Sequence, residues 1–193
     1  MVKCAALELA TGDAALLATD VGPVIDAEAF DGIQKHIERL KSESKPLLAH
    51  INRAQAAPDT VAMNVVDPHA FEVSSVSDVK AEIFGPVLHI VRWGGDPALV
   101  IDQINALGYG LTLGIQTRID LRAQQLATRA HVGNVYINRA MTGAVVGVQP
   151  FGGEGLSGTG PKAGGPHYLL RFCSEQTVTV NTTAAGGNAA LLA

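Results

Sequence analysis

The chain has 193 residues, of which 47% are hydrophobic and 17% charged, and its formal net charge at pH 7 is −4. This composition is typical of a folded globular protein and excludes a chain that is disordered throughout. The small net charge and the scattered lysines and arginines predict no nucleic-acid partner, and no apolar run approaches the roughly 20 residues that a membrane-spanning helix needs.

The first half of the chain predicts two helices and several short extended segments. Residues 2–9 have the pattern of a short helix that ends near Gly12, since glycine readily takes the left-handed conformation after a helix. A second helix is predicted from Asp26 to about Lys41, because Asp26 is a favourable N-cap and apolar residues recur every three or four positions. Extended segments are expected at residues 47–50, 61–66 and 71–73.

The second half alternates between segments typical of strands and segments typical of helices. Continuous apolar runs favour strands, whereas apolar residues spaced three or four apart favour helices. This alternation predicts an α/β fold with a mostly parallel sheet flanked by helices on both faces. The five elements are a strand at 87–91, a helix at 97–106, a strand at 111–116, a helix at 120–130 and a strand at 135–137.

Residues 142–166 are rich in glycine and have no regular pattern. Such a stretch costs conformational entropy that a purely structural loop avoids, so it is a good place to look for a site. After it, residues 177–180 alternate like a half-exposed strand. We therefore predict one domain over residues 1–176 and a C-terminal strand and tail over residues 177–193.

Glu82 and Phe84 precede the predicted strand 87–91 and are candidates for binding a nucleotide cofactor. Gly85 and Pro86 restrict the backbone between these residues and the strand. A carboxylate held there can accept two hydrogen bonds from a ribose diol, and the phenyl ring offers an apolar face to the neighbouring sugar and nicotinamide. Taken alone, such a glutamate is as often an ordinary loop acid, so other motifs have to decide between the two interpretations.

Six short motifs follow one another along the chain. They are Gly12-Asp13 with Thr19-Asp20-Val21-Gly22-Pro23, Glu82-Ile83-Phe84-Gly85-Pro86, Asn105 with Gly108-Tyr109-Gly110-Leu111, Gly133-Asn134-Val135-Tyr136-Ile137-Asn138, Pro150-Phe151-Gly152-Gly153, and Ser157-Gly158. In residue type and order these motifs resemble those of the aldehyde dehydrogenase superfamily. A chance match to one of them is common, whereas matches to all six in order are not. Residues 142–166 and 177–188 are further similar to the C-terminal part of the glutamate semialdehyde (1-pyrroline-5-carboxylate) dehydrogenase domain of the bacterial bifunctional proline utilization A proteins.

The resemblance implies an NAD-dependent enzyme that oxidises glutamate semialdehyde to glutamate in proline catabolism. Glu82 and Phe84 would contact the NAD cofactor. The backbone N–H groups of Gly143 and Ala144 would hold the carboxylate end of the substrate, as exposed consecutive N–H groups suit an anion. Phe151 would pack on the aliphatic part of the substrate. A full-length parent of this kind would also carry FAD in a separate proline dehydrogenase domain.

The resemblance also implies that residues 1–176 are an incomplete catalytic domain. In the family a cysteine thiolate attacks the aldehyde, hydride passes to the nicotinamide, and a glutamate activates the water that hydrolyses the thioester. Those two residues would belong to a missing N-terminal half, so no catalytic residue is assigned and the 193-residue chain alone is expected to be inactive. Cys4 is expected to pack on its helix, and Cys173 to be a small buried residue.

The resemblance further implies that the strand within residues 177–193 pairs with a partner subunit, giving a homo-oligomer, or with an accompanying domain. The two cysteines and six histidines lack metal-ligand spacing, so no metal is predicted. The absence of a secretory signal pattern favours a cytoplasmic location. Two other functions stay open: a non-catalytic assembly module or remnant that keeps the fold, and a dehydrogenase of the same superfamily that acts on another aldehyde.

Overall fold

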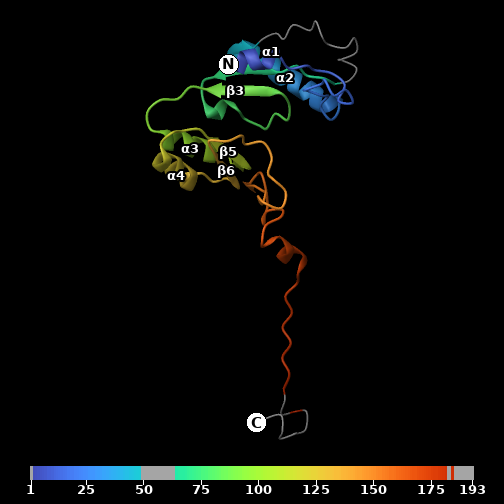
Figure 1. Cartoon of the computed structure of the whole chain (residues 1–193), viewed down its shortest axis with the longest axis vertical. Helices are drawn as coiled ribbons and strands as arrows, with labels where there is room; N and C mark the ends of the chain where they lie inside the picture. The colour runs from blue at the N-terminus through green and yellow to red at the C-terminus, as the bar shows by residue number, and fades with distance from the viewer. Residues whose placement is uncertain (1, 49–63, 182–183, 185–193) are drawn as a thin grey trace. The chain divides into compact units, whose positions relative to one another are not determined.

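The structure is a computed structural model that describes residues 2–48, 64–181 and 184. The chain divides into two compact units, the first formed by residues 1–108 and 128–130 and the second by residues 109–127 and 131–193. Helices and strands occur in both units (Figure 1). The first unit contains α1 (Val2–Leu7), α2 (Ala27–Glu43), β1 (Lys45–Leu48), β2 (His69–Val73), the 3-10 helix η1 (Val76–Asp78), β3 (Val87–Val91) and α3 (Pro97–Asn105).

The sheet of the first unit has the strand order β1-β2-β3. β1 runs antiparallel to β2, and β2 runs parallel to β3 from the pair His69 and Val87 to the pair Val73 and Val91. Strands were therefore correctly predicted near 71–73 and at 87–91. The strand predicted at 47–50 occurs as β1, with residues 49–50 outside the described part. Of the predicted segment 61–66, residues 64–66 form no strand and the rest lies outside the description.

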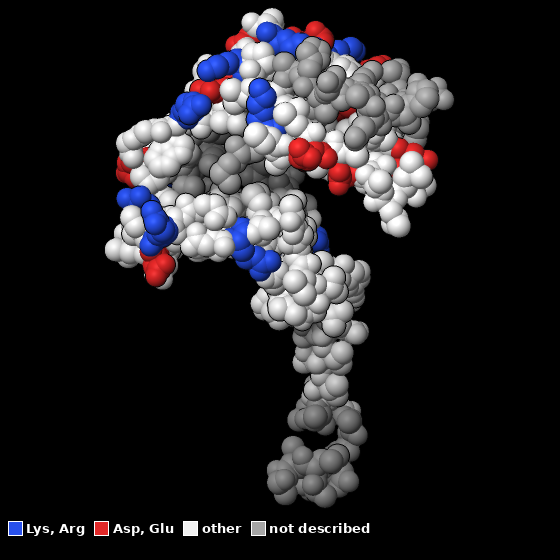
Figure 2. Space-filling model, turned by 45° about the horizontal axis from the view of Figure 1, so that its top comes forward, with Lys and Arg blue, Asp and Glu red and all other residues white. Residues whose placement is uncertain are grey.

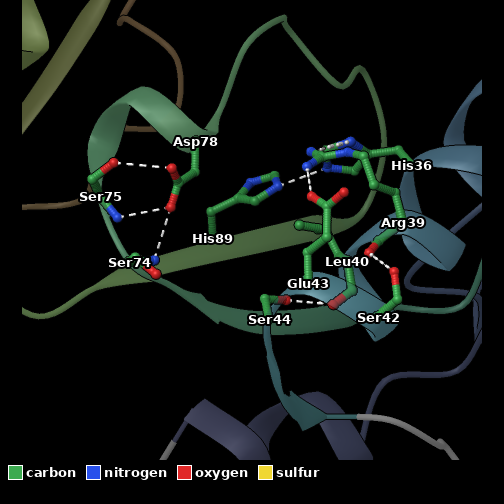
Figure 3. Close-up of polar contacts among 10 residues, drawn as sticks. All are labelled: His36, Arg39, Leu40, Ser42, Glu43, Ser44, Ser74, Ser75, Asp78 and His89. Carbon is green, nitrogen blue, oxygen red and sulfur yellow. Dashed lines mark hydrogen bonds and ion pairs between the residues drawn. The ribbon is translucent and has the colours of Figure 1, made fainter.

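The predicted helix that starts at Asp26 is confirmed as α2, which ends two residues later than expected. Asp26 caps it, because the Oδ1 atom of Asp26 accepts a hydrogen bond of 2.8 Å from the N–H of Ala29. At the other end, the Ser44 hydroxyl donates a hydrogen bond of 2.6 Å to the carbonyl oxygen of Leu40 (Figure 3). Both ends of α2 are thus closed by side chains next to the helix.

α2 packs its apolar face on the core of the first unit. Ile33, Ile37 and Leu40 lie four and three residues apart, so they share one side of the helix. All three are buried in one cluster with Phe71 and Val73 of β2. Burying an aliphatic or aromatic side chain of this size contributes about 1.5–3 kcal/mol relative to leaving it exposed. This cluster is the main reason that α2 stays on the sheet.

The described part of the second unit contains two short strand pairs and most of one α-helix. Its elements are β4 (Tyr109–Gly110), β5 (Thr112–Ile115), α4 (Asp120–Arg129, whose last two residues cluster with the first unit), β6 (Asn134–Ile137), β7 (Glu154–Gly155) and the 3-10 helix η2 (Tyr168–Phe172). β5 and β6 run parallel and are joined through α4, the crossover that a parallel pair requires. β4 runs antiparallel to β7.

The α/β class predicted from the sequence is confirmed, but the expectation of one mostly parallel sheet was wrong for the described residues. The strands form three small sheets instead, and the parallel pairs are split between two of them. β3 pairs with β2 in the first unit, and β5 pairs with β6 in the second. The order of elements along the chain indicates strands and crossovers, but it does not say which strands bond to each other, because that depends on contacts between distant residues.

Residues 142–181 contain little regular structure apart from β7 and η2. The backbones of Phe151 and Ala163 are joined by two hydrogen bonds, of 3.0 and 2.9 Å. Residues 174–181 form neither helix nor strand, and Val178 and Val180 are exposed. The C-terminal strand expected at 177–180 is thus not formed within the described chain, and its pairing with a partner stays a prediction.

Basic and acidic side chains are interspersed on the face of the molecule that Figure 2 shows. Within the described residues, no helix combines the length and the apolar character that crossing a bilayer requires. The same residues contain no group of three or more side chains able to hold a metal ion together.

Candidate functional site

Phe84, the first candidate for cofactor binding, lies at the tip of a tight turn in the first unit. The N–H of Gly85 donates a hydrogen bond of 2.8 Å to the carbonyl oxygen of Ile83, which places Phe84 at the centre of a three-residue turn. Phe84 is 83% exposed, and Glu82 is exposed as well. Ile83, between them, packs against the buried cluster of α2. The turn therefore presents a carboxylate and an aromatic ring to the solvent while the residue between them anchors it.

Gly85 allows this turn to approach α2 closely. A Cβ atom at Gly85 would lie 2.5 Å from Cδ1 of Ile33, closer than carbon atoms pack in folded proteins. The missing side chain at Gly85 thus makes room for Ile33 beneath the turn. Glu82 and Phe84 are held in place by contacts that Ile83 and Gly85 make with the core, and a larger residue at position 85 would have to displace Ile33.

Residues 142–149, in the second unit, form an exposed loop that turns at two glycines. Gly143 and Gly147 have φ angles of 66° and 79°, in the left-handed region that favours glycine. The N–H of Val145 donates a hydrogen bond of 3.1 Å to Oε1 of Gln149. Among the described residues, the N–H groups of Gly143 and Ala144 donate no hydrogen bond. The loop therefore offers two consecutive N–H groups to a ligand, an arrangement suited to an anion.

Two side chains of β6 hold the ends of the stretch that carries the predicted substrate residues. Tyr136 is 5% exposed, and its hydroxyl donates a hydrogen bond of 3.1 Å to the carbonyl oxygen of Gly143. Asn134 donates from Nδ2 to the carbonyl oxygen of Pro150 at 3.0 Å and accepts at Oδ1 from the N–H of Gly152 at 3.3 Å. These two contacts flank Phe151, which is partly buried.

Neither Tyr136 nor Asn134 was predicted as a functional residue. Their spacing could have indicated a shared role, since residues two apart on a strand point to the same face. Both lie in the motif Gly133-Asn134-Val135-Tyr136-Ile137-Asn138, which was used only to recognise the family. Which loop that face of the strand meets depends on the tertiary structure.

The glycine-rich motif after Phe151 is required by close contacts between backbone segments. A Cβ atom at Gly133 would overlap the carbonyl oxygen of Gly152. A Cβ atom at Gly153 would lie 2.8 Å from each of the carbonyl oxygens of Gly110 and Ser157. These segments cross without room for side chains, so the backbone on either side of Phe151 is tightly fixed.

An open concavity of about 1020 Å³ lies on the second unit, along β6 and the glycine-rich segments. Its lining includes Tyr136 and the side chains of Arg139, Lys162 and His167. The Nζ atom of Lys162 donates a hydrogen bond to the carbonyl oxygen of Gly133. The guanidinium of Arg139 lies over the ring of Tyr136, with Cζ 5.0 Å from the ring centroid. The face of β6 that supports the loop thus also borders this concavity.

The expectation that both cysteines are packed was wrong, because Cys4 and Cys173 are exposed. Cys4 lies on α1, a six-residue helix with no buried residue, so this helix has no core within the described chain to pack against. Cys173 follows η2, and its thiol lies 3.5 Å from the carbonyl oxygen of Leu169. Neither position was predicted to be catalytic.

The five predicted site residues fall into two groups. Glu82 and Phe84 lie together on one turn of the first unit. Gly143, Ala144 and Phe151 lie in the second unit, where hydrogen bonds tie both ends of their stretch to β6. The first group offers a carboxylate and an exposed aromatic ring, and the second offers two consecutive backbone N–H groups and a partly buried aromatic ring.

Comparison with known proteins gives the class to which this fold and these motifs belong. The chain matches the aldehyde dehydrogenase family over residues 1–178, and it is a member of that family. Among curated proteins, it is 49% identical to the bifunctional protein PutA of Escherichia coli (strain K12) over 179 residues, which cover 91% of this chain and 14% of that protein. It is 38% identical to the 1-pyrroline-5-carboxylate dehydrogenase of Geobacillus kaustophilus (strain HTA426), covering 89% of this chain and 32% of that protein.

The solved structures to which the chain is similar are of the same two kinds of protein. The chain is similar to a Bradyrhizobium japonicum proline utilization A structure with a TM-score of 0.83 and 51% identity, over 95% of this chain and 18% of that one. It is also similar to a Thermus 1-pyrroline-5-carboxylate dehydrogenase with bound NAD, with a TM-score of 0.74 and 35% identity, over 88% of this chain and 32% of that one. The predicted family relationship is confirmed, and the chain spans less than a third of the length of these relatives.

Proposed function

We propose that this chain is part of an NAD-dependent L-glutamate γ-semialdehyde (1-pyrroline-5-carboxylate) dehydrogenase, which oxidises the semialdehyde to glutamate in proline catabolism. The observation that carries the proposal is the loop at Gly143 and Ala144, whose consecutive N–H groups donate to no described residue. A substrate with a carboxylate at the end opposite its aldehyde matches this loop. Phe151, fixed near the other end of the same stretch, supplies the apolar surface that the methylene groups of such a substrate need.

NAD is the proposed cofactor, with Glu82 and Phe84 as its contacts in this chain. The Glu82 carboxylate would accept hydrogen bonds from the hydroxyl groups of the nicotinamide ribose. The exposed ring of Phe84 would lose its contact with water by packing against the ribose and nicotinamide. The relative from Thermus is a 1-pyrroline-5-carboxylate dehydrogenase with bound NAD, which supports this choice. A parent of the PutA type would carry FAD in a separate proline dehydrogenase domain.

The chemical step is proposed to use a cysteine outside these 193 residues, as the family resemblance implies. Its thiolate would add to the aldehyde carbon, hydride would pass from that carbon to NAD, and water would hydrolyse the resulting thioester. Cys4 and Cys173 are both exposed, and Cys4 lies in α1, far along the chain from the Gly143 loop. The 193-residue chain alone is therefore proposed to be inactive, and the remainder of the enzyme to be its partner.

The test is NADH formation by the complete protein that carries this chain. Glutamate semialdehyde is compared with an uncharged aliphatic aldehyde of the same chain length. The wild-type protein is expected to prefer the carboxylated substrate. An Ala144→Asp substitution, which places a negative charge beside the substrate carboxylate, should raise KM for the semialdehyde by at least about tenfold, because each factor of ten corresponds to about 1.4 kcal/mol.

Phe84→Ala provides the matching test on the cofactor side. It should raise KM for NAD and leave KM for the semialdehyde unchanged. Preference of the wild-type protein for the uncharged aldehyde would instead favour a dehydrogenase of the same family with another substrate. Activity of the isolated 193-residue chain, lost on replacing Cys4 or Cys173, would contradict the assignment of the nucleophile to another segment.

A second proposed role concerns assembly through residues 177–193, taken as a separate segment from a domain over residues 1–176. Val178 and Val180 are exposed in a segment with no regular structure, and unpaired backbone next to apolar side chains can add to the edge of another sheet. Truncation after residue 176 should lower the oligomeric state of the complete protein in native mass spectrometry. An unchanged assembly with retained NAD-dependent activity would rule out this role for the tail.

A further inference from the structure

β6 directs two side chains to the two ends of one loop. Asn134 and Tyr136 are two residues apart on this strand and so lie on the same face. Tyr136 bonds to the carbonyl oxygen of Gly143, at the end that carries the two N–H groups that donate to no described residue. Asn134 bonds to the carbonyl oxygen of Pro150 and to the N–H of Gly152, on either side of Phe151. Both ends of the loop are thus hydrogen-bonded to side chains of the same strand.

The end of the loop near Phe151 is also held by two backbone hydrogen bonds between Phe151 and Ala163, whereas the end near Gly143 has few other contacts within the described residues. Val145, Val146 and Val148 are exposed, so the segment between its ends is not anchored by apolar packing. The Tyr136 ring is buried, and Arg139 lies over it at 5.0 Å, which holds the hydroxyl in place. The internal bond between Val145 and Gln149 shapes the loop without fixing it to the strand.

We infer that Tyr136 and Asn134 are positioning residues that set the separation between the anion-binding N–H groups of Gly143 and Ala144 and the ring of Phe151. The two residues thereby favour a carboxylated aldehyde over an uncharged one of the same length. This inference rests on the proposed function of the loop. Tyr136 controls the end that meets the carboxylate, whereas Asn134 controls the end that meets the methylene groups, so the two residues should have separable effects.

The experiment uses the complete protein and measures KM and kcat with glutamate semialdehyde and with an uncharged aliphatic aldehyde of the same length. Tyr136→Phe removes only the hydroxyl that bonds to Gly143. KM for the semialdehyde should rise about 5- to 10-fold, as expected for losing one hydrogen bond that orders a binding loop, with kcat nearly unchanged. KM for the uncharged aldehyde should stay the same. A purely structural role would change both substrates alike.

Tyr168→Phe is the matched control. Tyr168 lies in η2, and within the described chain its hydroxyl makes no hydrogen bond, so its removal should leave both KM values unchanged. Asn134→Asp keeps the acceptor for the N–H of Gly152 and removes the donor to Pro150. It should raise KM for both aldehydes, because both place methylene groups against Phe151. This second variant also keeps the inference testable where Tyr136→Phe does not fold.

Two results would overturn the inference. One is an equal change in KM for both aldehydes, or no change, in folded Tyr136→Phe protein. The other is an Asn134→Asp protein whose KM values match those of the wild type. Failure of the proposed function looks different, since it is seen in the wild-type protein as a lack of preference for the semialdehyde over the uncharged aldehyde.

Discussion

The Nε2 atoms of His36 in α2 and His89 in β3 lie 2.8 Å apart, so one imidazole donates a hydrogen bond to the other (Figure 3). Arg39 fixes the direction of this bond. Its Nη2 atom lies 3.4 Å from Nδ1 of His36, and a guanidinium can only donate, so Nδ1 accepts and the proton of His36 lies on Nε2. His36 is then the donor, His89 the acceptor, and both rings are neutral in the folded chain.

We expect the first unit to lose stability as the pH falls below about 6.5. Burial, followed by the charges of His89 and Arg39, lowers the pKa of His36, with an opposing effect of Glu43. Burial, followed by Arg39, lowers the pKa of His89. Because the unfolded chain titrates near 6.5, it binds more protons than the folded chain below that pH. The contribution of the neutral histidine pair to the free energy of unfolding is therefore fully present above pH 6.5. It is lost as the pH falls from there through the lowered pKa values.

Urea unfolding measured between about pH 8 and pH 5 checks this prediction. A double His36→Gln, His89→Gln substitution should make the unfolding midpoint less dependent on pH in that range. His69→Gln is the control, since the Nδ1 atom of His69 bonds to the carbonyl oxygen of Asp67 outside the pair. An equal pH dependence in the wild type and the double variant would show that the pair is not responsible.

Asp26→Ala should destabilise the protein by about 1 kcal/mol, because the first turn of α2 loses the acceptor for the N–H of Ala29. Asp31→Ala is the control, as Asp31 is an exposed residue within the same helix. It removes the same charge without removing a cap, and alanine is the better helix former. Thermal unfolding of both variants measures the difference, and equal losses would contradict the capping role.

Phe71→Ala should destabilise the protein by about 3–5 kcal/mol, because Phe71 is fully buried between β2 and α2 and its loss leaves a cavity. Leu17→Ala removes a similar apolar side chain from a fully exposed position and should change stability by less than about 0.5 kcal/mol. Denaturant titrations give both values. A small loss for Phe71→Ala would mean that the cluster of the first unit does not hold α2 on its sheet.

Gly133→Ala should prevent normal packing of the second unit, because the new Cβ atom would overlap the carbonyl oxygen of Gly152. A cost of at least about 1–3 kcal/mol is expected from such overpacking. Gly32→Ala is the contrasting change: nothing lies within 4 Å of its Cβ position, and α2 should gain up to about 1 kcal/mol. Similar stability of the two variants by thermal unfolding would contradict the close crossing at Gly133.

The sequence correctly predicted those helices and strands that depend on residues close together in the chain. The cap at Asp26 and the apolar spacing of Ile33, Ile37 and Leu40 predicted α2, and Pro97 marked the start of α3. The family followed from motifs read in order, among them the segments at Phe84 and Phe151. These features depend on neighbouring residues or on a pattern of residue types, both of which are visible in one dimension.

Other features required the fold. Pairing of β3 with β2, and the exposure of both cysteines, depend on which distant segments meet. The same holds for the hydrogen bond between His36 and His89, which are 53 residues apart.

The sequence by itself determined the helices, most strands, the family and the residue types of a proposed dehydrogenase site. Only the tertiary structure decided that Tyr136 bonds to Gly143 and that Asn134 bonds to the residues on either side of Phe151. The physical reason is that a strand specifies which of its side chains share a face, whereas the partner of that face is chosen by packing and hydrogen bonding across the fold.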